Sequence, residues 1–380
     1  MKDPIHAFRE DCVPPSPEKH YSASSSGRSR RVLFVATQLD KPEAHMIAEL
    51  ARTGVEAIVI VGPSRRYASI LEVAGIPVHV WTWSRALWSP KRRKLRELLA
   101  GIQPDIVHAF DNAALYETWR SLQIKTVSSI IYRGAPFVSW RSRRLYRQCD
   151  VSRIACLSST VRTAMEQYGY PAEKLVTIYK GHDPAWYRPA TAERLLELGL
   201  PPGVRLVGTA ARWRDWKMGP TLVEAFQRLP DDPGIHLLFI GEICDPALER
   251  LRKDPACCRR IHFVGEQQDA PSLLGACEVM VMPSNEQEGL CKAVLEAMAQ
   301  GVPAIVSNVG GPSEIVRDGI EGLNVQPGDD QALAAAMQRL LNDEPFRKAC
   351  GERALSRVKS TFALATTITR YQTLYQELIP

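Results

Sequence analysis

Apolar and polar positions alternate along the chain in short blocks, so that apolar runs typical of buried strands are separated by amphipathic segments with helical spacing. In the first half, the strand-like runs are RVLFVAT, AIVIVG, VHVW, DIVHAF, TVSSIIY and RIACLS, with helix-like segments such as PEAHMIAELARTG between them. The second half repeats the pattern with RLVGTAA, IHLLFIGE, IHFVG, EVMVMPS and PAIVS. Repeated alternation of strand and helix predicts an α/β fold with doubly wound parallel sheets.

The alternation is interrupted once, by the Pro-rich segment GHDPAWYRP that begins at Gly181. We interpret this segment as a linker between two domains, because the 380 residues of the chain are enough for two buried cores. Residues 1–30 contain Pro14, Pro15 and Pro17 and are expected to form a mobile leader. Two such sheets in tandem without a GxGxxG motif predict a two-lobed enzyme that binds ligands at the carboxyl ends of its strands.

Composition narrows the class of protein. Apolar residues make up 45% of the chain and charged residues 24%, which is ordinary for a globular protein. No apolar run approaches the roughly 20 residues that cross a bilayer, and nothing near Met1 looks like a signal peptide. The nine cysteines are scattered and lack a CxxC pair, which predicts reduced thiols in the cytoplasm. The net charge of +6 and the pI near 8.8 indicate an anionic partner without identifying it.

The chemistry is concentrated in residues 282–301, MPSNEQEGLCKAVLEAMAQG. An apolar strand precedes this segment, a polar turn opens it, and a helical pattern follows from Gly289 to Gln300. Strand, loop and helix in this order aim backbone N–H groups and a helix dipole at an anion. Glu288 and Glu296 are separated by about 80° around a helix axis, so both can face one crevice. The alternative is an amphipathic helix whose glutamates only face water.

With its flanking PS, EGL, EAMA and GVPAIVS segments, this Glu-x7-Glu pattern resembles the family-4-type retaining glycosyltransferases of the GT-B fold, also called glycosyl transferases group 1. The resemblance implies that Glu288 and the backbone N–H groups of Gly289, Leu290 and Cys291 hold the donor sugar and its phosphates. It also implies that Glu296 accepts hydrogen bonds from the ribose of the nucleotide.

The family also implies a domain organisation. Two Rossmann-like doubly wound domains would face each other across a cleft, with residues 31–183 on the acceptor side and residues 184–360 binding the nucleotide sugar. Residues 361–380 would form a helix that crosses back to the first domain. The linker segment at Gly181 is similar to the family's linker, which often reads Gly-Val-Asp followed by an aromatic residue and Pro.

A second candidate element is GTAARWRDWKMGPTLVEAF, which places Arg212 and Lys217 in a loop directly after a strand. A planar guanidinium and a compact ammonium can reach a diphosphate from two directions. A solvated basic loop is the alternative, since Arg214 lies there too. The pair resembles the family's Arg-x4-Lys-Gly element, except that Met218 stands where Gly is usual, which indicates a displaced helix start. The resemblance implies that both cations neutralise charge on the leaving nucleoside diphosphate.

Three further positions are candidates. The segment GGPSEIVRDG contains Gly311 and Glu314, and in the family this loop lies beside the donor sugar. His108 closes an apolar strand and is either on the acceptor side of the site or a hydrogen-bonded core residue. Arg133 stands where the family commonly has a His that contacts the transferred sugar. An Arg there would suit an anionic sugar or a phosphorylated acceptor, or it is structural. The family's Gly-Gly loop after the first strand is replaced by TQLDKPEAH, so phosphate contact from that side is in doubt.

These features favour a retaining transferase that moves a sugar from a nucleotide-sugar donor to a glycan or glycolipid hydroxyl, in lipopolysaccharide or other cell-envelope glycan synthesis. No DxD motif occurs, so no catalytic metal is expected, and no cofactor is implied because the nucleotide sugar is a substrate. The alternatives are a nucleotide-sugar epimerase of the same fold and a non-catalytic protein that binds nucleotide sugars.

The first half also carries two basic stretches with aromatic residues. Trp81, Trp83 and Trp88 precede KRRKLR, and Trp140 and Tyr146 are interleaved with four arginines. Cations beside interfacial aromatics suit an anionic membrane surface, which predicts a cytoplasmic enzyme that binds peripherally to the inner face of the membrane. A solvated basic face is the alternative. Nucleic acid is not expected, because the cleft motifs already account for anion binding.

Overall fold

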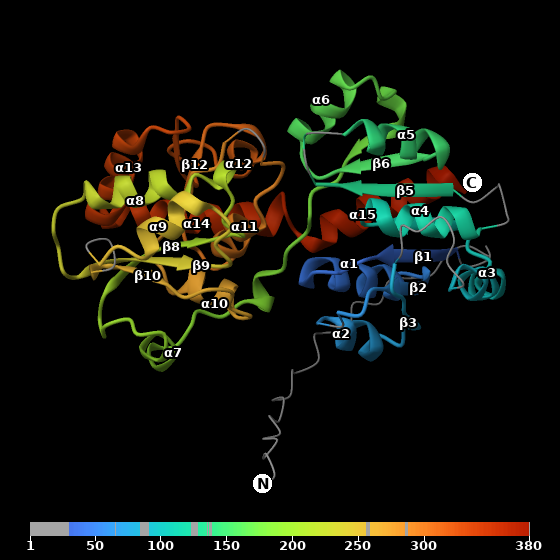
Figure 1. Ribbon diagram of the computed structural model, residues 1–380, viewed down its shortest axis with the longest axis horizontal. Helices are drawn as coiled ribbons and strands as arrows, with labels where there is room; N and C mark the ends of the chain where they lie inside the picture. Colours follow the sequence, from blue (N-terminus) through green and yellow to red (C-terminus); the bar gives the residue numbers. More distant parts are fainter. Residues whose placement is uncertain are drawn as a thin grey trace, which may run out of the picture.

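The computed structural model describes residues 30–64, 66–83, 91–122, 128–134, 136, 139–255, 259–285 and 288–379. These residues form two lobes, each built on a parallel sheet with helices on both faces (Figure 1). The expected leader lies outside the described residues, apart from Arg30, and so does Trp88.

The N-terminal lobe has a seven-stranded sheet in the order β3-β2-β1-β4-β5-β6-β7, with every pair of neighbours parallel. β1 lies near the middle because its sequence RVLFVA is apolar on both faces, as a central parallel strand requires. The strands are β1 Arg31–Ala36, β2 Glu56–Val61, β3 Val78–Val80, β4 Ile106–Ala109, β5 Ser128–Arg133, β6 Arg153–Cys156 and β7 Leu175–Thr177. The helices are α1 Lys41–Arg52, α2 Ala68–Val73, α3 Lys91–Ile102, α4 Asn112–Ser121, α5 Trp140–Gln148, α6 Ser159–Gln167 and the 3-10 turn η1 Ala172–Lys174.

The C-terminal lobe has a six-stranded parallel sheet in the order β10-β9-β8-β11-β12-β13. Its strands are β8 Arg205–Ala210, β9 Ile235–Ile240, β10 Ile261–Phe263, β11 Val279–Met282, β12 Ala304–Ser307 and β13 Gly322–Val325. Its helices are α7 Ala192–Glu197, α8 Gly219–Gln227, α9 Pro246–Arg252, α10 Ala270–Gly275, α11 Lys292–Met298, α12 Gly310–Ile315, α13 Asp330–Asn342 and α14 Glu344–Ser360, with 3-10 turns η2 Pro184–Trp186 and η3 Asp215–Lys217.

The chain crosses between the lobes twice, and the two crossings lie side by side. The backbone N–H of His182 donates to the carbonyl of Phe362 at 2.8 Å, and the N–H of Leu364 donates to the carbonyl of His182 at 3.1 Å. After the second crossing, α15 (Leu364–Leu378) runs along the N-terminal lobe to the end of the chain (Figure 1). Its buried side chains Tyr371 and Tyr375 join the core that includes Val32 and Phe34. The last helix therefore belongs, by packing, to the first lobe.

No helix in the described part of the chain is long and apolar enough to cross a membrane.

Candidate donor site

The carboxyl ends of β8 and β11 bring two predicted residues together. The ammonium of Lys217 forms an ion pair with the carboxylate of Glu288, and the Ser284 hydroxyl lies 3.3 Å from the same carboxylate oxygen. Both side chains of the pair are buried, with Lys217 8% and Glu288 7% exposed. Charged side chains are rarely buried unless they are paired or bind a ligand, so this buried pair is a candidate ligand-binding site.

Lys217 is positioned by an unusual backbone turn. It ends η3, and the next residue, Met218, has φ 54° and ψ 41°, the left-handed region that glycine favours. α8 begins directly at Gly219. Met218 therefore adopts, without being a glycine, a conformation that glycine favours, and the helix starts at the residue after it.

Next to this pair, the loop that leads into α11 offers free backbone donors. The sequence predicts a helix from Gly289, but α11 begins at Lys292, with Cys291 extended at φ −86° and ψ 98°. Within the described residues, the N–H groups of Gly289, Leu290 and Cys291 donate no hydrogen bond to the protein. Cys291 itself is buried, which raises the pKa of its thiol to about 12. The segment can therefore donate to an anion through its backbone, while the thiol is unsuited to act as a nucleophile.

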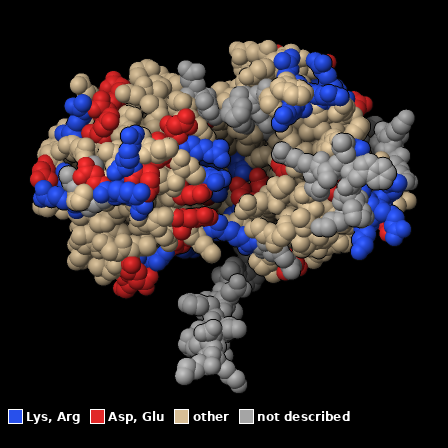
Figure 2. Space-filling model, in the orientation of Figure 1, with Lys and Arg blue, Asp and Glu red and all other residues tan. Residues whose placement is uncertain are grey.

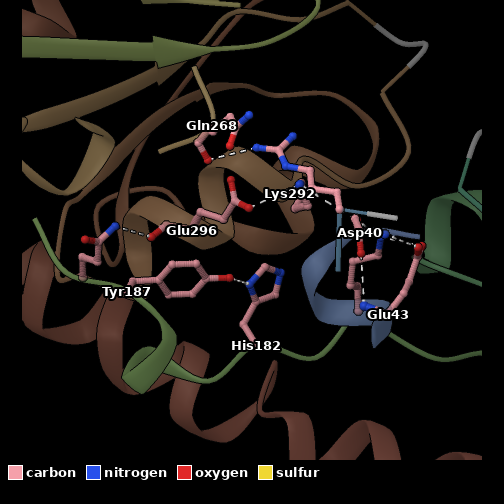
Figure 3. Close-up of polar contacts among 10 residues, drawn as sticks. Asp40, Glu43, His182, Tyr187, Gln268, Lys292 and Glu296 are labelled. Carbon is pink, nitrogen blue, oxygen red and sulfur yellow. Dashed lines mark hydrogen bonds and ion pairs between the residues drawn. The ribbon is translucent and has the colours of Figure 1, made fainter. Parts of the chain in front are cut away.

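Glu296 lies on the buried side of α11, 6% exposed. The ammonium of Lys292 lies 3.3 Å from its carboxylate and 4.0 Å from the carboxylate of Asp40 in the other lobe (Figure 3). Burial raises the pKa of Glu296, and the charge of Lys292 opposes this rise. Glu296 thus lies near the boundary between the lobes, and its contact with the ribose stays a prediction.

The N-terminal lobe contributes a buried charge cluster in place of the family's Gly-Gly loop. Asp40 and Glu43 form a capping box at the start of α1. Lys180, at the end of the first lobe, donates to the carboxylate of Asp40 at 2.6 Å and to that of Glu43 at 2.9 Å. Although burial alone would lower the pKa of Lys180, these two carboxylates raise it well above its ordinary value. The sequence pattern does not predict this cluster. The Asp-x-x-Glu spacing predicts the helix cap, but it does not predict that the distant Lys180 pairs with both carboxylates.

The backbones of the two lobes touch at Gly134 and Gly289, where a Cβ placed on Gly289 would lie 1.9 Å from the carbonyl oxygen of Gly134. Within the C-terminal lobe, Gly289 is packed as closely against Gly311, where a Cβ would lie 1.7 Å from the carbonyl oxygen of Gly289. Only residues without a side chain allow this approach. Gly134 directly follows Arg133, the last residue of β5, so the strand end that carries Arg133 faces the donor loop. The side chain of Arg133 lies outside the described residues.

Glu314 has a different set of contacts from the one predicted. Its carboxylate accepts hydrogen bonds from the backbone N–H and hydroxyl of Thr160, both at 2.6 Å, from the N–H of Ser159 at 2.9 Å and from the hydroxyl of Tyr179 at 3.0 Å. Although burial raises its pKa, these hydrogen bonds lower it overall. Glu314 therefore caps α6 of the opposite lobe and links the two lobes, while its place beside the donor sugar stays a prediction.

Two other candidates lie apart from the Lys217–Glu288 pair. The side chain of Arg212 is 60% exposed and pairs with Glu242 at 2.9 Å. His108 is fully buried; its Nδ1 lies 2.8 Å from the Tyr375 hydroxyl, and burial lowers its pKa to about 3. His108 is therefore a neutral, hydrogen-bonded core residue beneath α15, and this position gives it no access to an acceptor. No group of three or more His, Cys, Asp or Glu that could hold a metal occurs among the described residues.

Two Rossmann-like lobes that face each other, with donor-site groups at the carboxyl ends of the strands, constitute the GT-B fold, and the predicted fold is confirmed. The family description "Glycosyl transferases group 1" matches residues 196–357, and "Glycosyltransferase Family 4" matches residues 44–186. The chain belongs to this family of glycosyltransferases, as the Glu288 segment and its flanks indicate.

Two curated relatives show the range of the family. The lipopolysaccharide core biosynthesis mannosyltransferase LpsB of Rhizobium meliloti is 30% identical, over 63% of this chain and 68% of its own length. The N-acetyl-alpha-D-glucosaminyl L-malate synthase of Bacillus anthracis is 28% identical, over 61% of each chain. The match thus spans less than two thirds of the latter relative.

Among solved structures, Anabaena HepE in complex with UDP-glucose aligns with 91% of this chain and 99% of its own. The TM-score is 0.77 at 22% sequence identity, so this likeness supports the fold alone.

Proposed function

We propose that this protein transfers a sugar from a nucleotide-sugar donor to an acceptor hydroxyl with retention of anomeric configuration, in the synthesis of lipopolysaccharide or another envelope glycan. The observation that carries the proposal is the buried Lys217–Glu288 pair beside the N–H groups of residues 289–291, which have no partner among the residues that the structure describes. The relation to a lipopolysaccharide core mannosyltransferase supports the choice of acceptor class.

Each group has a role in this reaction. The diphosphate of the donor would bind the N–H groups of residues 289–291 and draw Lys217 toward itself, which frees the carboxylate of Glu288 for the sugar hydroxyls. Glu296 would accept hydrogen bonds from the ribose. Lys217, with Arg212 approaching from the surface, would stabilise the charge that grows on the leaving phosphate, so that the reaction needs no metal.

The bond changes follow from this placement. The bond between the anomeric carbon and the phosphate oxygen breaks while the acceptor oxygen attacks from the same face of the sugar. The proton of the acceptor hydroxyl passes to the departing phosphate oxygen, which makes a protein nucleophile unnecessary. Contacts across the lobes, such as that of Glu314 with α6, would keep water out and orient the acceptor.

The test begins with the donor. Stabilisation of the full chain against heat by UDP-, GDP- and ADP-sugars identifies the nucleotide, because a ligand that binds only the folded state raises the melting temperature. Turnover with that donor and a glycolipid acceptor is then followed by NMR of the anomeric proton, with and without EDTA. We expect a retained configuration and unchanged rates in EDTA. An inverted product contradicts retention, and loss of activity in EDTA contradicts metal independence.

The same assay separates the alternatives. An epimerase changes the configuration of the donor sugar without any acceptor. A non-catalytic binding protein is stabilised by the nucleotide sugar but produces no nucleoside diphosphate from it. Release of nucleoside diphosphate that depends on added acceptor is expected only of the transferase.

We expect Glu296→Ala to weaken nucleotide binding more than it slows the chemical step. Ribose hydrogen bonds hold ground state and transition state alike, so their loss affects affinity first. A hydrogen bond to a charged group contributes about 1.5–3 kcal/mol, which predicts about a 10- to 100-fold higher Kd for the nucleoside diphosphate in calorimetry. Glu352→Ala, an exposed change on α14, is the matched control. An unchanged Kd in the Glu296 variant would refute the ribose assignment.

We further propose that the acceptor is lipid-linked and that the enzyme works in the cytoplasm at the inner face of the membrane. The basic stretch of the N-terminal lobe on α5 supports this placement. No nucleic-acid partner is proposed.

A further inference from the structure

One face of α5 presents a continuous basic stripe to solvent. The exposed positions are Trp140, Arg141, Arg144, Arg147 and Gln148, which recur at helical spacing and therefore lie on one side of the helix. Trp140 at the start of the stripe is 67% exposed, and the Arg141 guanidinium lies 5.5 Å from its ring centre. Figure 2 shows Lys and Arg side chains gathered on the part of the N-terminal lobe where α5 lies. A tryptophan exposed beside arginines is typical of helices that lie in the interface of an anionic membrane.

The charge of α5 is not balanced within the helix. Its sequence WRSRRLYRQ contains no Asp or Glu, and the carboxylate of Asp150, just beyond its end, lies 3.6 Å from Lys174. The other basic helix, α3, differs in this respect. There Arg93 lies 3.4 Å from Glu97 in the same helix. Both helices keep a similar net positive charge, so what distinguishes α5 is the exposed Trp140 at the start of its basic face.

Behind the stripe lies a cavity of about 330 Å³, between α5 and the chain around η1. Its walls combine the cations Arg143, Arg147 and Lys174 with the aromatic rings of Tyr168 and Tyr170. Asp150 is the one carboxylate among the residues that line it, so the cations outnumber the anions. Arg143 is held in place because its guanidinium donates to the carbonyl of Tyr168 at 2.7 Å. Cations above aromatic walls suit a phosphate ester that carries an apolar group.

The position of α5 relates this surface to the donor site. Gly134, which touches the donor loop at Gly289, lies at the carboxyl end of β5, and Trp140 begins α5 shortly after it. The stripe therefore starts near the boundary between the lobes and extends away from it along α5.

We propose that the exposed face of α5 docks on an anionic phospholipid surface and that the cavity beside it takes a phospholipid phosphate headgroup. The proposal rests on the proposed function, since it places the cleft beside a membrane that holds a lipid-linked acceptor. The proposal is based on charge complementarity, because the arginines would face the lipid phosphates while Trp140 enters the headgroup region.

The test compares two variants of the full chain that lose the same charge. Arg141→Ser/Arg144→Ser/Arg147→Ser changes the stripe, and Arg93→Ser/Lys94→Ser/Arg96→Ser changes exposed positions of α3. Each is sedimented with vesicles of phosphatidylcholine, with or without phosphatidylglycerol, at low and high salt. We expect the α5 variant to lose about 100-fold in partitioning onto the anionic vesicles and the α3 variant less than about fivefold. Binding of the unchanged protein should fall as salt screens the charges.

Several outcomes would overturn the proposal: equal loss in both variants, no loss in the α5 variant, or equal binding to neutral and anionic vesicles. Free glycerol phosphate that protects the α5 region from hydrogen exchange, without any vesicle binding, would assign the cavity to a soluble phosphate and also overturn it. Thermal stabilisation by the nucleotide sugar and turnover of a soluble acceptor are measured on the same variants. Both should be unchanged, so a failure of lipid binding is distinguished from a failure of the transferase assignment.

Discussion

Replacing Lys217 with alanine is expected to lower turnover by about 10²–10³, the usual loss when one preorganised charge stabiliser is removed from an active site. Lys217 is buried against Glu288, so its removal also leaves a carboxylate without its counter-charge at the place where the diphosphate would bind. We expect the loss mainly in kcat, because the charge on the leaving phosphate is greatest in the transition state.

Two other variants serve as comparisons for the Lys217 variant. Arg212→Ala should also slow turnover but by less, because the Arg212 side chain is 60% exposed and already pairs with Glu242. Lys359→Ala, an exposed change at the end of α14, should leave turnover unchanged. Normal turnover in the Lys217 variant would contradict the role given to the Lys217–Glu288 pair.

Replacing Gly289 with alanine is expected to reduce kcat by about 10²-fold or more while the fold remains intact. The added Cβ would lie 1.9 Å from the carbonyl oxygen of Gly134, which no real contact allows, so the lobes would have to stay further apart. A displacement of about 1 Å from the productive geometry can cost 10²-fold in rate. Because the conflict is relieved by opening the lobes, each lobe should keep its own core.

The measurements are kcat, the thermal midpoint and the radius of gyration from small-angle X-ray scattering with donor present. The Gly289 variant should show a larger radius and a nearly normal midpoint. Gly101→Ala on α3, where a Cβ meets nothing within 4 Å, is the matched control and should behave like the unchanged protein. Full activity in the Gly289 variant would show that the reaction does not need this close approach.

The sequence predicts the fold because central parallel strands are buried on both faces and appear as uninterrupted apolar runs, as in RVLFVA and IHLLFI. It also predicts the elements that supply Lys217 and Glu288, since each lies in a loop directly after such a strand. The sequence does not predict that these two side chains form an ion pair, because they follow different strands and meet only in the tertiary structure.

Other parts of the site could not be predicted because their partners come from the opposite lobe. Glu314 looks like a donor-site residue in its own segment, and only the approach of α6 turns it into a cross-lobe cap. The later start of α11 is also a tertiary feature, since the loop before it contains Gly289, which is packed against Gly134 of the other lobe. Lys180 cannot be assigned to Asp40 from the sequence, since 140 positions separate them.

The family resemblance, and not the periodicity, predicts the last helix, but the structure shows that a helical period is present. The buried positions Thr367, Ile368, Tyr371, Leu374 and Tyr375 recur at the spacing of one helix face. Threonine and tyrosine obscure this pattern because both carry polar groups, and they are buried here against the first lobe.

The packing of α15 sets a rule for chimaeras between relatives. The N-terminal lobe consists of two stretches that are distant in the sequence, residues 30–181 and the helix Leu364–Leu378. A chimaera that exchanges only the first stretch would set foreign strands against Tyr371 and Tyr375, and the buried His108 of one parent would lose the hydroxyl that its ring nitrogen contacts. A transplanted lobe should therefore carry its own carboxyl-terminal helix, with the recipient supplying only the chain from the first crossing to the second.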